Sequence, residues 1–131
     1  MNSYQTKESM NEHPNKYPLE ERTTIYGEKI VKFCKLLTKD PLTTPLTVQL
    51  LRSGTSIGAN YMEANNASSK RDFTNKIFIC KKEAQETKYW LRIIKVQHPE
   101  HTETLKTLWQ EAQELTLIFQ KITNTARKVS I

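Results

Sequence analysis

Apolar residues recur every three or four positions along most of the chain, which is the spacing of one face of an α-helix. Short polar breaks that contain Pro, Asn or Asp divide this pattern into four segments. The pattern predicts helices over about residues 23–39, 44–66, 69–97 and 100–127. Almost no stretch shows the alternation with a period of two that predicts a strand.

The connections between the four segments are short, so neighbouring helices are expected to be antiparallel. The predicted fold class is therefore all-α, an antiparallel up-down four-helix bundle over residues 21–131. Residues 1–20 contain few apolar side chains and two prolines, and we expect a flexible N-terminal tail there.

Local signals mark the predicted ends of the helices. Thr44 followed by Pro45 is typical of an N-cap with proline at the first helical position. Ser69 with Asp72 resembles a capping box in which Asp replaces the usual Glu. The first helix is expected to bury Ile30, Val31, Cys34 and Leu37.

The second helix contains two glycines four residues apart, Gly54 and Gly58, among other small residues. An interior glycine costs a helix about 1 kcal/mol relative to alanine. Such a cost is offset when the missing side chain lets another backbone come close. We therefore predict that this face packs against a neighbouring helix at short range.

The third helix has a second apolar face, formed by Ile79, Trp90 and Ile93, with Glu83 and Glu86 beside it. A helix in a small monomeric bundle needs one apolar face. Because aromatic residues are enriched in interface cores, this face indicates contact between subunits. The alternative is a wide core stripe, partly covered by a neighbouring helix or by the tail.

Three polar residues of the second helix are also assigned to packing or to an interface: Arg52, Asn60 and Glu63. Arg52 and Glu63 lie three turns apart, too far for a direct pair. We expect Arg52 to meet Glu83 or Glu86, and Glu63 to meet Arg92 or a lysine. These contacts are interpreted as structural and register-setting, with a catalytic role as the alternative.

The run Leu51-Arg-Ser-Gly-Thr-Ser-Ile-Gly-Ala-Asn-Tyr-Met-Glu-Ala64 resembles the signature of a bacterial four-helix-bundle family, as do Ser69–Phe73 and Glu83–Leu91. These proteins are encoded in intervening sequences of 23S ribosomal RNA genes and are called S23-like. The resemblance implies a homo-oligomer in the form of a pentameric ring. It also suggests kinship with the accessory protein of diversity-generating retroelements, which binds a reverse transcriptase and nucleic acid. It supplies no catalytic residues.

The formal net charge is +6, and residues 68–98 contribute eight basic and three acidic side chains, or +5. The candidate nucleic-acid-binding residues form a stripe on the third helix with an aromatic nearby: Lys70, Lys81, Lys88, Arg92, Lys95 and Tyr89. Such a stripe can track phosphates, and the aromatic can stack an unpaired base. The alternative is a solvated helix face with no ligand.

Arg92 and His98 resemble the Arg-x(4–6)-His motif of HEPN ribonucleases, which are all-helical and cut RNA without metal. In that reading His98 is the acid/base and Arg92 steadies the scissile phosphate. The motif usually has a polar residue after the arginine, whereas this chain has Ile93.

No cofactor and no metal site are expected. His98 and His101 lack further ligands, and no Glu is followed by His three residues later, as di-iron bundles require. Cys34 and Cys80 fall at apolar helical positions and are read as reduced core residues, rather than as a disulfide or metal ligands. Without a signal peptide or a membrane span, a cytoplasmic protein is expected.

Three functions follow as hypotheses. The leading one is a non-enzymatic oligomer that binds RNA, DNA or a nucleoprotein through the basic third helix. The second is a metal-independent ribonuclease that uses Arg92 and His98. The third is a scaffold that binds another protein, such as a reverse transcriptase.

Overall fold

The computed structural model describes residues 18–130 and the side chains as far as Arg127. This part of the chain contains four α-helices: α2 (Leu19–Cys34), α3 (Thr43–Asn65), α4 (Lys70–Gln97) and α5 (Thr102–Ser130). A single 3₁₀ turn, η3 (Pro99–His101), precedes α5. No strand occurs between residues 18 and 130. The predicted all-α class is therefore confirmed.

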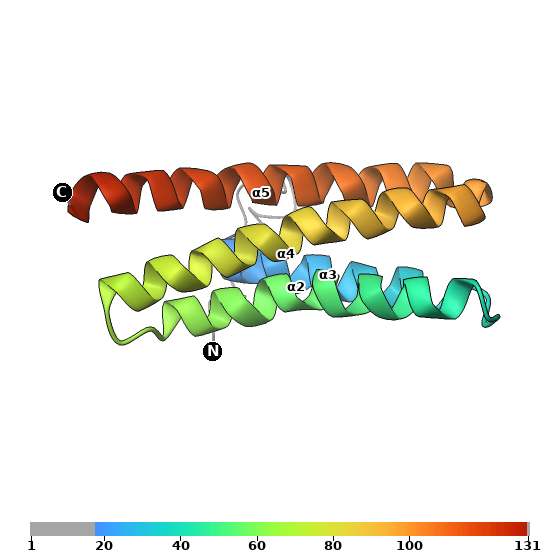
Figure 1. The fold of residues 1–131 in the computed structure, drawn as a ribbon, viewed down its shortest axis with the longest axis horizontal. Helices are drawn as coiled ribbons and strands as arrows, with labels where there is room; N and C mark the ends of the chain where they lie inside the picture. Colours follow the sequence, from blue (N-terminus) through green and yellow to red (C-terminus); the bar gives the residue numbers. More distant parts are fainter. Residues whose placement is uncertain (1–17, 131) are drawn as a thin grey trace.

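Successive helices run in opposite directions, as Figure 1 shows, and α5 extends past its neighbours at the carboxyl end. The α3–α4 and α4–α5 pairs make the most extensive helix contacts. α2 lies along α3 but touches α5 in few places. The bundle is thus packed on both sides of α4 and open between α2 and α5.

The core is a continuous apolar cluster to which all four helices contribute. On α4 the buried apolar residues recur at the spacing of one helical face: Ile77, Cys80, Ala84, Leu91 and Ile94. Tyr26 is 1% exposed, and its hydroxyl donates to the carbonyl of Leu108, so its one polar group has a partner. Burial of such side chains contributes about 1.5–3 kcal/mol each.

The helix ends match the sequence signals on α4 and depart from them on α3. The Ser69 hydroxyl accepts from the Asp72 amide at 3.0 Å, as an N-cap does. On α3 the N-cap position is Leu42 instead of Thr44, and the carboxylate of Asp40, two residues earlier, accepts from the amides of Leu42 and Thr43. Thr43 thus begins the helix one residue earlier than predicted.

The first helix differs most from the prediction. It spans Leu19–Cys34 instead of residues 23–39. The tail predicted over residues 1–20 therefore overlaps the start of this helix, and residues 1–17 lie outside the described part. Pro18 precedes the helix, and proline readily occupies a helix start. Val31 was expected in the core but is 41% exposed, while Phe33 is buried at 3%.

Gly54 and Gly58 lie against α2 at short range. A Cβ added to Gly54 would be 2.8 Å from Cγ1 of Ile30, and one added to Gly58 would be 3.2 Å from the carbonyl oxygen of Thr23. By contrast, a Cβ on Gly27 would meet ordinary contacts, the nearest being Cα of Thr55 at 3.8 Å. The close helix contact is therefore within one chain, between α2 and α3.

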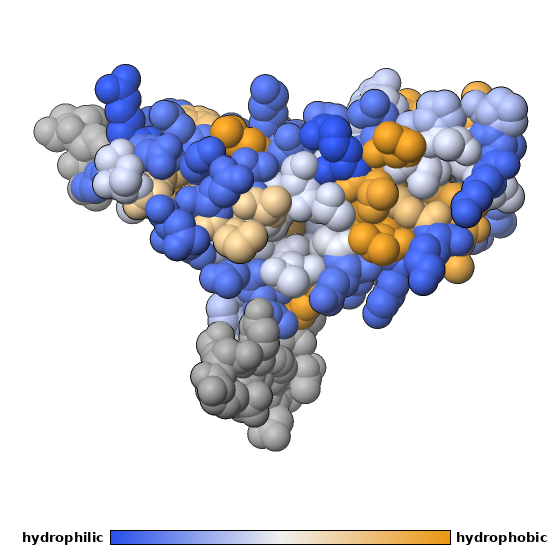
Figure 2. Space-filling view, turned by 90° about the horizontal axis from the view of Figure 1, so that it is seen from below, coloured by the Kyte–Doolittle hydropathy of each residue, from blue (hydrophilic) through white to orange (hydrophobic). Residues whose placement is uncertain are grey.

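Large apolar side chains remain exposed around the α2–α3 connection. They form what we call the α2–α3 patch: Val31, Leu36, Leu42, Val48 and Leu51, from 39% to 62% exposed. In Figure 2, which views the molecule from below Figure 1, orange side chains gather on the half nearer this connection. An exposed group of this kind is typical of a contact surface.

Candidate nucleic-acid interface

The basic side chains of α4 lie beside α5. The Lys81 ammonium donates to the side-chain oxygen of Gln120, and the Lys88 ammonium donates to that of Gln113. Both lysines are half-buried, whereas Lys70, Arg92 and Lys95 are exposed. The stripe predicted from α4 alone is thus one side of a surface that α4 and α5 build together.

Two aromatic rings stand within this surface, and cations lie over them. Lys81 Nζ is 5.7 Å from the ring centroid of Phe78, and the Arg127 guanidinium lies 5.1 Å from the same ring. Lys88 Nζ is 5.2 Å from the Trp109 ring, which is 37% exposed. These distances are those of cation–π contacts. Cations and aromatic rings are therefore interleaved along the surface.

A groove of about 420 Å³ opens between the carboxyl half of α4 and the start of α5. Buried Leu91 and Leu105 contribute apolar side chains to it, and Trp109 lines it as well. Its remaining lining residues are polar or charged: Arg92, Lys95, Thr102, Glu103 and Lys106. With three basic residues and one acidic residue, the groove favours an anionic ligand.

Tyr89, the aromatic predicted to accompany the basic stripe, is placed differently. It is 55% exposed, and its ring packs edge-on against Trp90 with centroids 4.9 Å apart. Trp109 of α5 instead lines the groove with Arg92 and Lys95. The sequence reasoning missed Trp109, Phe78 and Lys106, because only the packing of α5 on α4 brings them to the basic stripe.

The opposite side of α4 carries an ion-pair cluster shared with α3. Arg52 lies 3.2 Å from a Glu83 oxygen and 2.6 Å from a Glu86 oxygen. The Trp90 indole N–H donates to the same Glu86 carboxylate at 3.1 Å. The hydrogen bonds from Arg52 and then Trp90 lower the pKa of Glu86 below its usual value. The cluster fixes the α3–α4 register within one chain.

The other residues assigned to packing or to an interface are also found along this side. Glu63 pairs with Lys76 at 2.8 Å, and the Asn60 side chain donates to the backbone carbonyl of Ser56. Trp90 is half-buried against the core, whereas Ile79 is 36% exposed. Ile93 is half-buried. The chain itself covers part of this apolar face and leaves the rest open to solvent.

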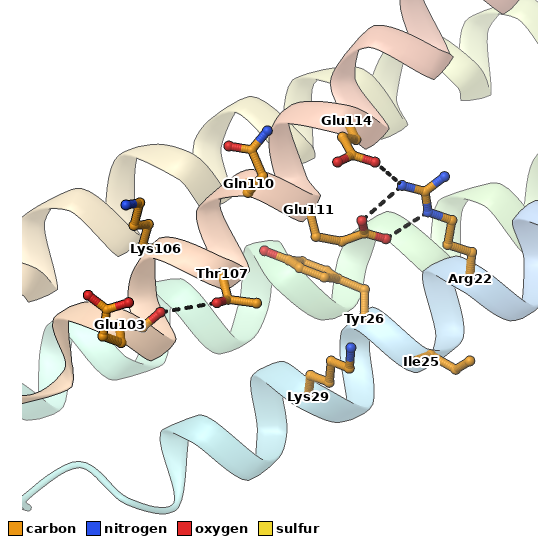
Figure 3. A pocket seen from close by; sticks show the side chains of 10 residues that line it. All are labelled: Arg22, Ile25, Tyr26, Lys29, Glu103, Lys106, Thr107, Gln110, Glu111 and Glu114. Carbon is orange, nitrogen blue, oxygen red and sulfur yellow. Dashed lines mark hydrogen bonds and ion pairs between the residues drawn. The ribbon is translucent and has the colours of Figure 1, made fainter. Parts of the chain in front are cut away.

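A second groove, of about 540 Å³, lies between α2 and α5. Figure 3 shows Arg22 reaching across it from α2 to Glu111 and Glu114 of α5. The Arg22 side chain is 6% exposed, with nitrogen–oxygen distances of 2.7 and 2.8 Å to these two carboxylates. Basic and acidic lining residues are equal in number here, three of each. This groove therefore has no preference for an anion.

Arg92 and His98, the ribonuclease candidates, occupy different settings. His98 is buried at 6% exposure; its Nε2 lies 3.0 Å from the Thr43 hydroxyl and its Nδ1 lies 3.0 Å from a Glu100 oxygen. Arg92 lines the α4–α5 groove, and His98 does not. Both ring nitrogens of His98 thus have partners within the chain, and the histidine joins the start of α3 to the end of α4.

The described residues offer few further groups for catalysis or metal binding. Burial raises the pKa of the Cys34 thiol to about 11 and that of the Cys80 thiol to about 12, and neither cysteine forms a disulfide. Between residues 18 and 130, no cluster of three or more His, Cys, Asp or Glu side chains is arranged to hold a metal ion. Over the same range, none of the helices has the length and hydropathy of a membrane span.

Comparison with known proteins identifies the family. Residues 21–127 match the family of the 23S rRNA-intervening sequence protein. A similar solved structure is the crystal structure, at 1.70 Å resolution, of a protein of unknown function from the S23 ribosomal protein family of Bacteroides thetaiotaomicron VPI-5482. It shares 33% sequence identity with this chain, covering 81% of this chain and 98% of its own length, with a TM-score of 0.75. No curated protein matches the chain. The resemblance seen in the signature of α3 is thereby confirmed, and the chain belongs to the 23S rRNA-intervening sequence protein family.

Proposed function

We propose that this protein is a non-enzymatic binding protein that holds RNA or DNA on the surface formed by α4 and α5. The observation that carries the proposal is the interleaving of cations with aromatic rings on that surface, where Lys88 lies over Trp109 and Lys81 and Arg127 lie over Phe78. Phosphates attract the cations and bases stack on the rings, so both parts of a nucleic acid find a partner.

We assign phosphate contacts to five basic residues of this surface: Lys81, Lys88, Arg92, Lys95 and Lys106. For a single strand, five contacts give a salt slope of about −3.5, so affinity falls about 100-fold between 50 and 200 mM salt.

The two free thiols suit a reducing compartment, and we place this activity in the cytoplasm.

We propose in addition that the bundle assembles into a homo-oligomeric ring, a pentamer as the family resemblance implies. Support comes from the α2–α3 patch and from the open part of the second apolar face of α4, where Ile79 is 36% exposed. Covering such side chains removes apolar area from water and stabilises association. The mass in solution, measured by light scattering, is expected to be five times the 15.3 kDa of one chain.

Charge reversal on the proposed surface tests nucleic-acid binding. The triple variant Arg92→Glu, Lys95→Glu and Lys106→Glu changes three exposed side chains that line the α4–α5 groove. Fluorescence anisotropy with a labelled single-stranded RNA is expected to show a salt slope smaller in magnitude by about 2, since three phosphate contacts are lost.

A matched control changes the same net charge elsewhere. Lys32→Glu, Lys35→Glu and Lys39→Glu alter three exposed lysines at the end of α2 and after it. This control is expected to retain most of the affinity. Equal losses in the two triple variants would show that overall charge alone attracts the RNA, and the proposed surface would then be wrong.

A further inference from the structure

The two grooves described above differ in the ligand that each can accept. In the α2–α5 groove, Arg22 is already neutralised by Glu111 and Glu114. In the α4–α5 groove, Arg92, Lys95 and Lys106 face one acidic residue, Glu103. A ligand with negative charge is therefore favoured only by the α4–α5 groove among these two.

The α4–α5 groove also offers apolar and aromatic surface. Leu91 and Leu105 line the groove but present little area at 1% and 2% exposure, whereas Trp109 is 37% exposed and presents more. Trp109 lines the groove, while Lys88, which lies over the same ring, does not line it. Part of the indole is thus available to a flat ligand even while the ammonium is in place.

Size adds a further restriction. A groove of about 420 Å³ lies at the lower end of the 300–1,000 Å³ range of sites for small ligands. It cannot accommodate a stacked duplex, whose bases are covered by one another and whose phosphates are on the outside. An unstacked base with its phosphate combines the flat apolar part and the anionic part that the lining residues require.

We propose that the α4–α5 groove binds one unpaired nucleotide of a single strand, with the base against Trp109 and the phosphate among Arg92, Lys95 and Lys106. This inference rests on the proposed nucleic-acid binding and adds the class of substrate: a single strand in preference to a duplex. Stacking on an aromatic side chain supplies the preference, because paired bases do not expose their faces.

The test compares the affinities of a single strand of about 12 uridines and of an RNA duplex of about the same length. Trp109→Ala is expected to weaken single-strand binding about 5- to 150-fold, the range for one stacked base, and to change duplex binding less than about twofold. Trp109→Phe should restore most of the loss. Tyr89→Ala tests the other candidate for base stacking, since Tyr89 is an exposed aromatic of α4 outside the groove.

Fluorescence supplies an independent readout. The chain has two tryptophans, so Trp90→Phe leaves Trp109 as the sole indole. The oligouridine is expected to quench this emission, and the duplex is not. Circular dichroism confirms that each variant is folded.

The outcomes separate this inference from the function on which it rests. If Trp109→Ala binds the single strand as tightly as the parent while the triple charge reversal is defective, the nucleotide site is wrong and the proposed surface survives. If Tyr89→Ala alone is defective, the base stacks outside the groove, and the site is again wrong. If the parent binds neither probe at 50 mM salt, the proposed function itself fails.

Discussion

Replacing Gly54 by alanine tests the close contact between α2 and α3. The added Cβ would lie 2.8 Å from Cγ1 and 2.9 Å from Cγ2 of Ile30, which is fully buried. Relief of such overlap requires a backbone or rotamer shift, which costs about 1–3 kcal/mol. Alanine also returns about 1 kcal/mol of helix propensity. The expected net effect is a loss of up to about 2 kcal/mol in the free energy of unfolding.

Gly27→Ala removes the ambiguity caused by propensity. Gly27 also lies inside a helix, but its added Cβ would meet Cα of Thr55 at 3.8 Å, an ordinary distance. This variant should gain about 0.5–1 kcal/mol. The propensity gain is common to both variants, so their difference, about 1–3 kcal/mol, isolates the overlap with Ile30.

The assay is urea unfolding followed by circular dichroism, with Ile30→Ala as a second background. Ile30→Ala removes all three atoms that the new Cβ would meet, so Gly54→Ala should become neutral or stabilising there. The double-mutant cycle then gives a coupling energy of the same 1–3 kcal/mol. Equal stabilities of Gly54→Ala and Gly27→Ala in the parent chain would refute the reasoning that close approach requires Gly54.

Three further measurements test individual contacts. The folded-state pKa of Glu86 is lowered, so its stabilisation is complete above the ordinary value of 4.5 and is lost as the pH falls through the folded value. Arg52→Ala should therefore cost up to about 1 kcal/mol in urea unfolding at pH 7, and its stability should converge with that of the parent as the pH falls through that folded value. His98→Ala should cost about 1–3 kcal/mol in urea unfolding, because the buried Thr43 hydroxyl loses its partner, and His98→Gln should recover part of this. Burial raises the pKa of Cys80 to about 12, so iodoacetamide at pH 8 should leave this thiol unmodified, as judged by mass spectrometry, until urea unfolds the chain.

The sequence predicted the middle of the fold better than its edges. The helix predicted over residues 69–97 matches α4 closely, because a long helix with one core face repeats the spacing of three and four residues many times. The first turn of α2 lacks the signal. There Arg22 is buried by Glu111 and Glu114, which are 89 and 92 residues away. No sequence feature near Arg22 indicates partners so far along the chain.

The sequence likewise predicted only part of the candidate site. The basic stripe is a property of one helix, so Lys81, Lys88 and Arg92 could be found from their spacing. The aromatic component depends on which helix lies beside α4 and in what register, and Trp109 comes from that neighbour. Periodicity shows which side of its own helix a residue faces. Which residue of the neighbouring helix lies beside it depends on tertiary packing.

The opening between α2 and α5 bears on the order in which the chain loses structure. α3, α4 and α5 are consecutive and pack pairwise, whereas α2 is held mainly along α3, with Arg22 and Tyr26 bridging to α5. A helix attached on one side detaches with less loss of contact than one packed on two. The amides of α2 should therefore exchange with deuterium earlier than those of α4, as a separate cooperative unit. A helix that detaches in this way would give the bundle a folding intermediate made of its last three helices.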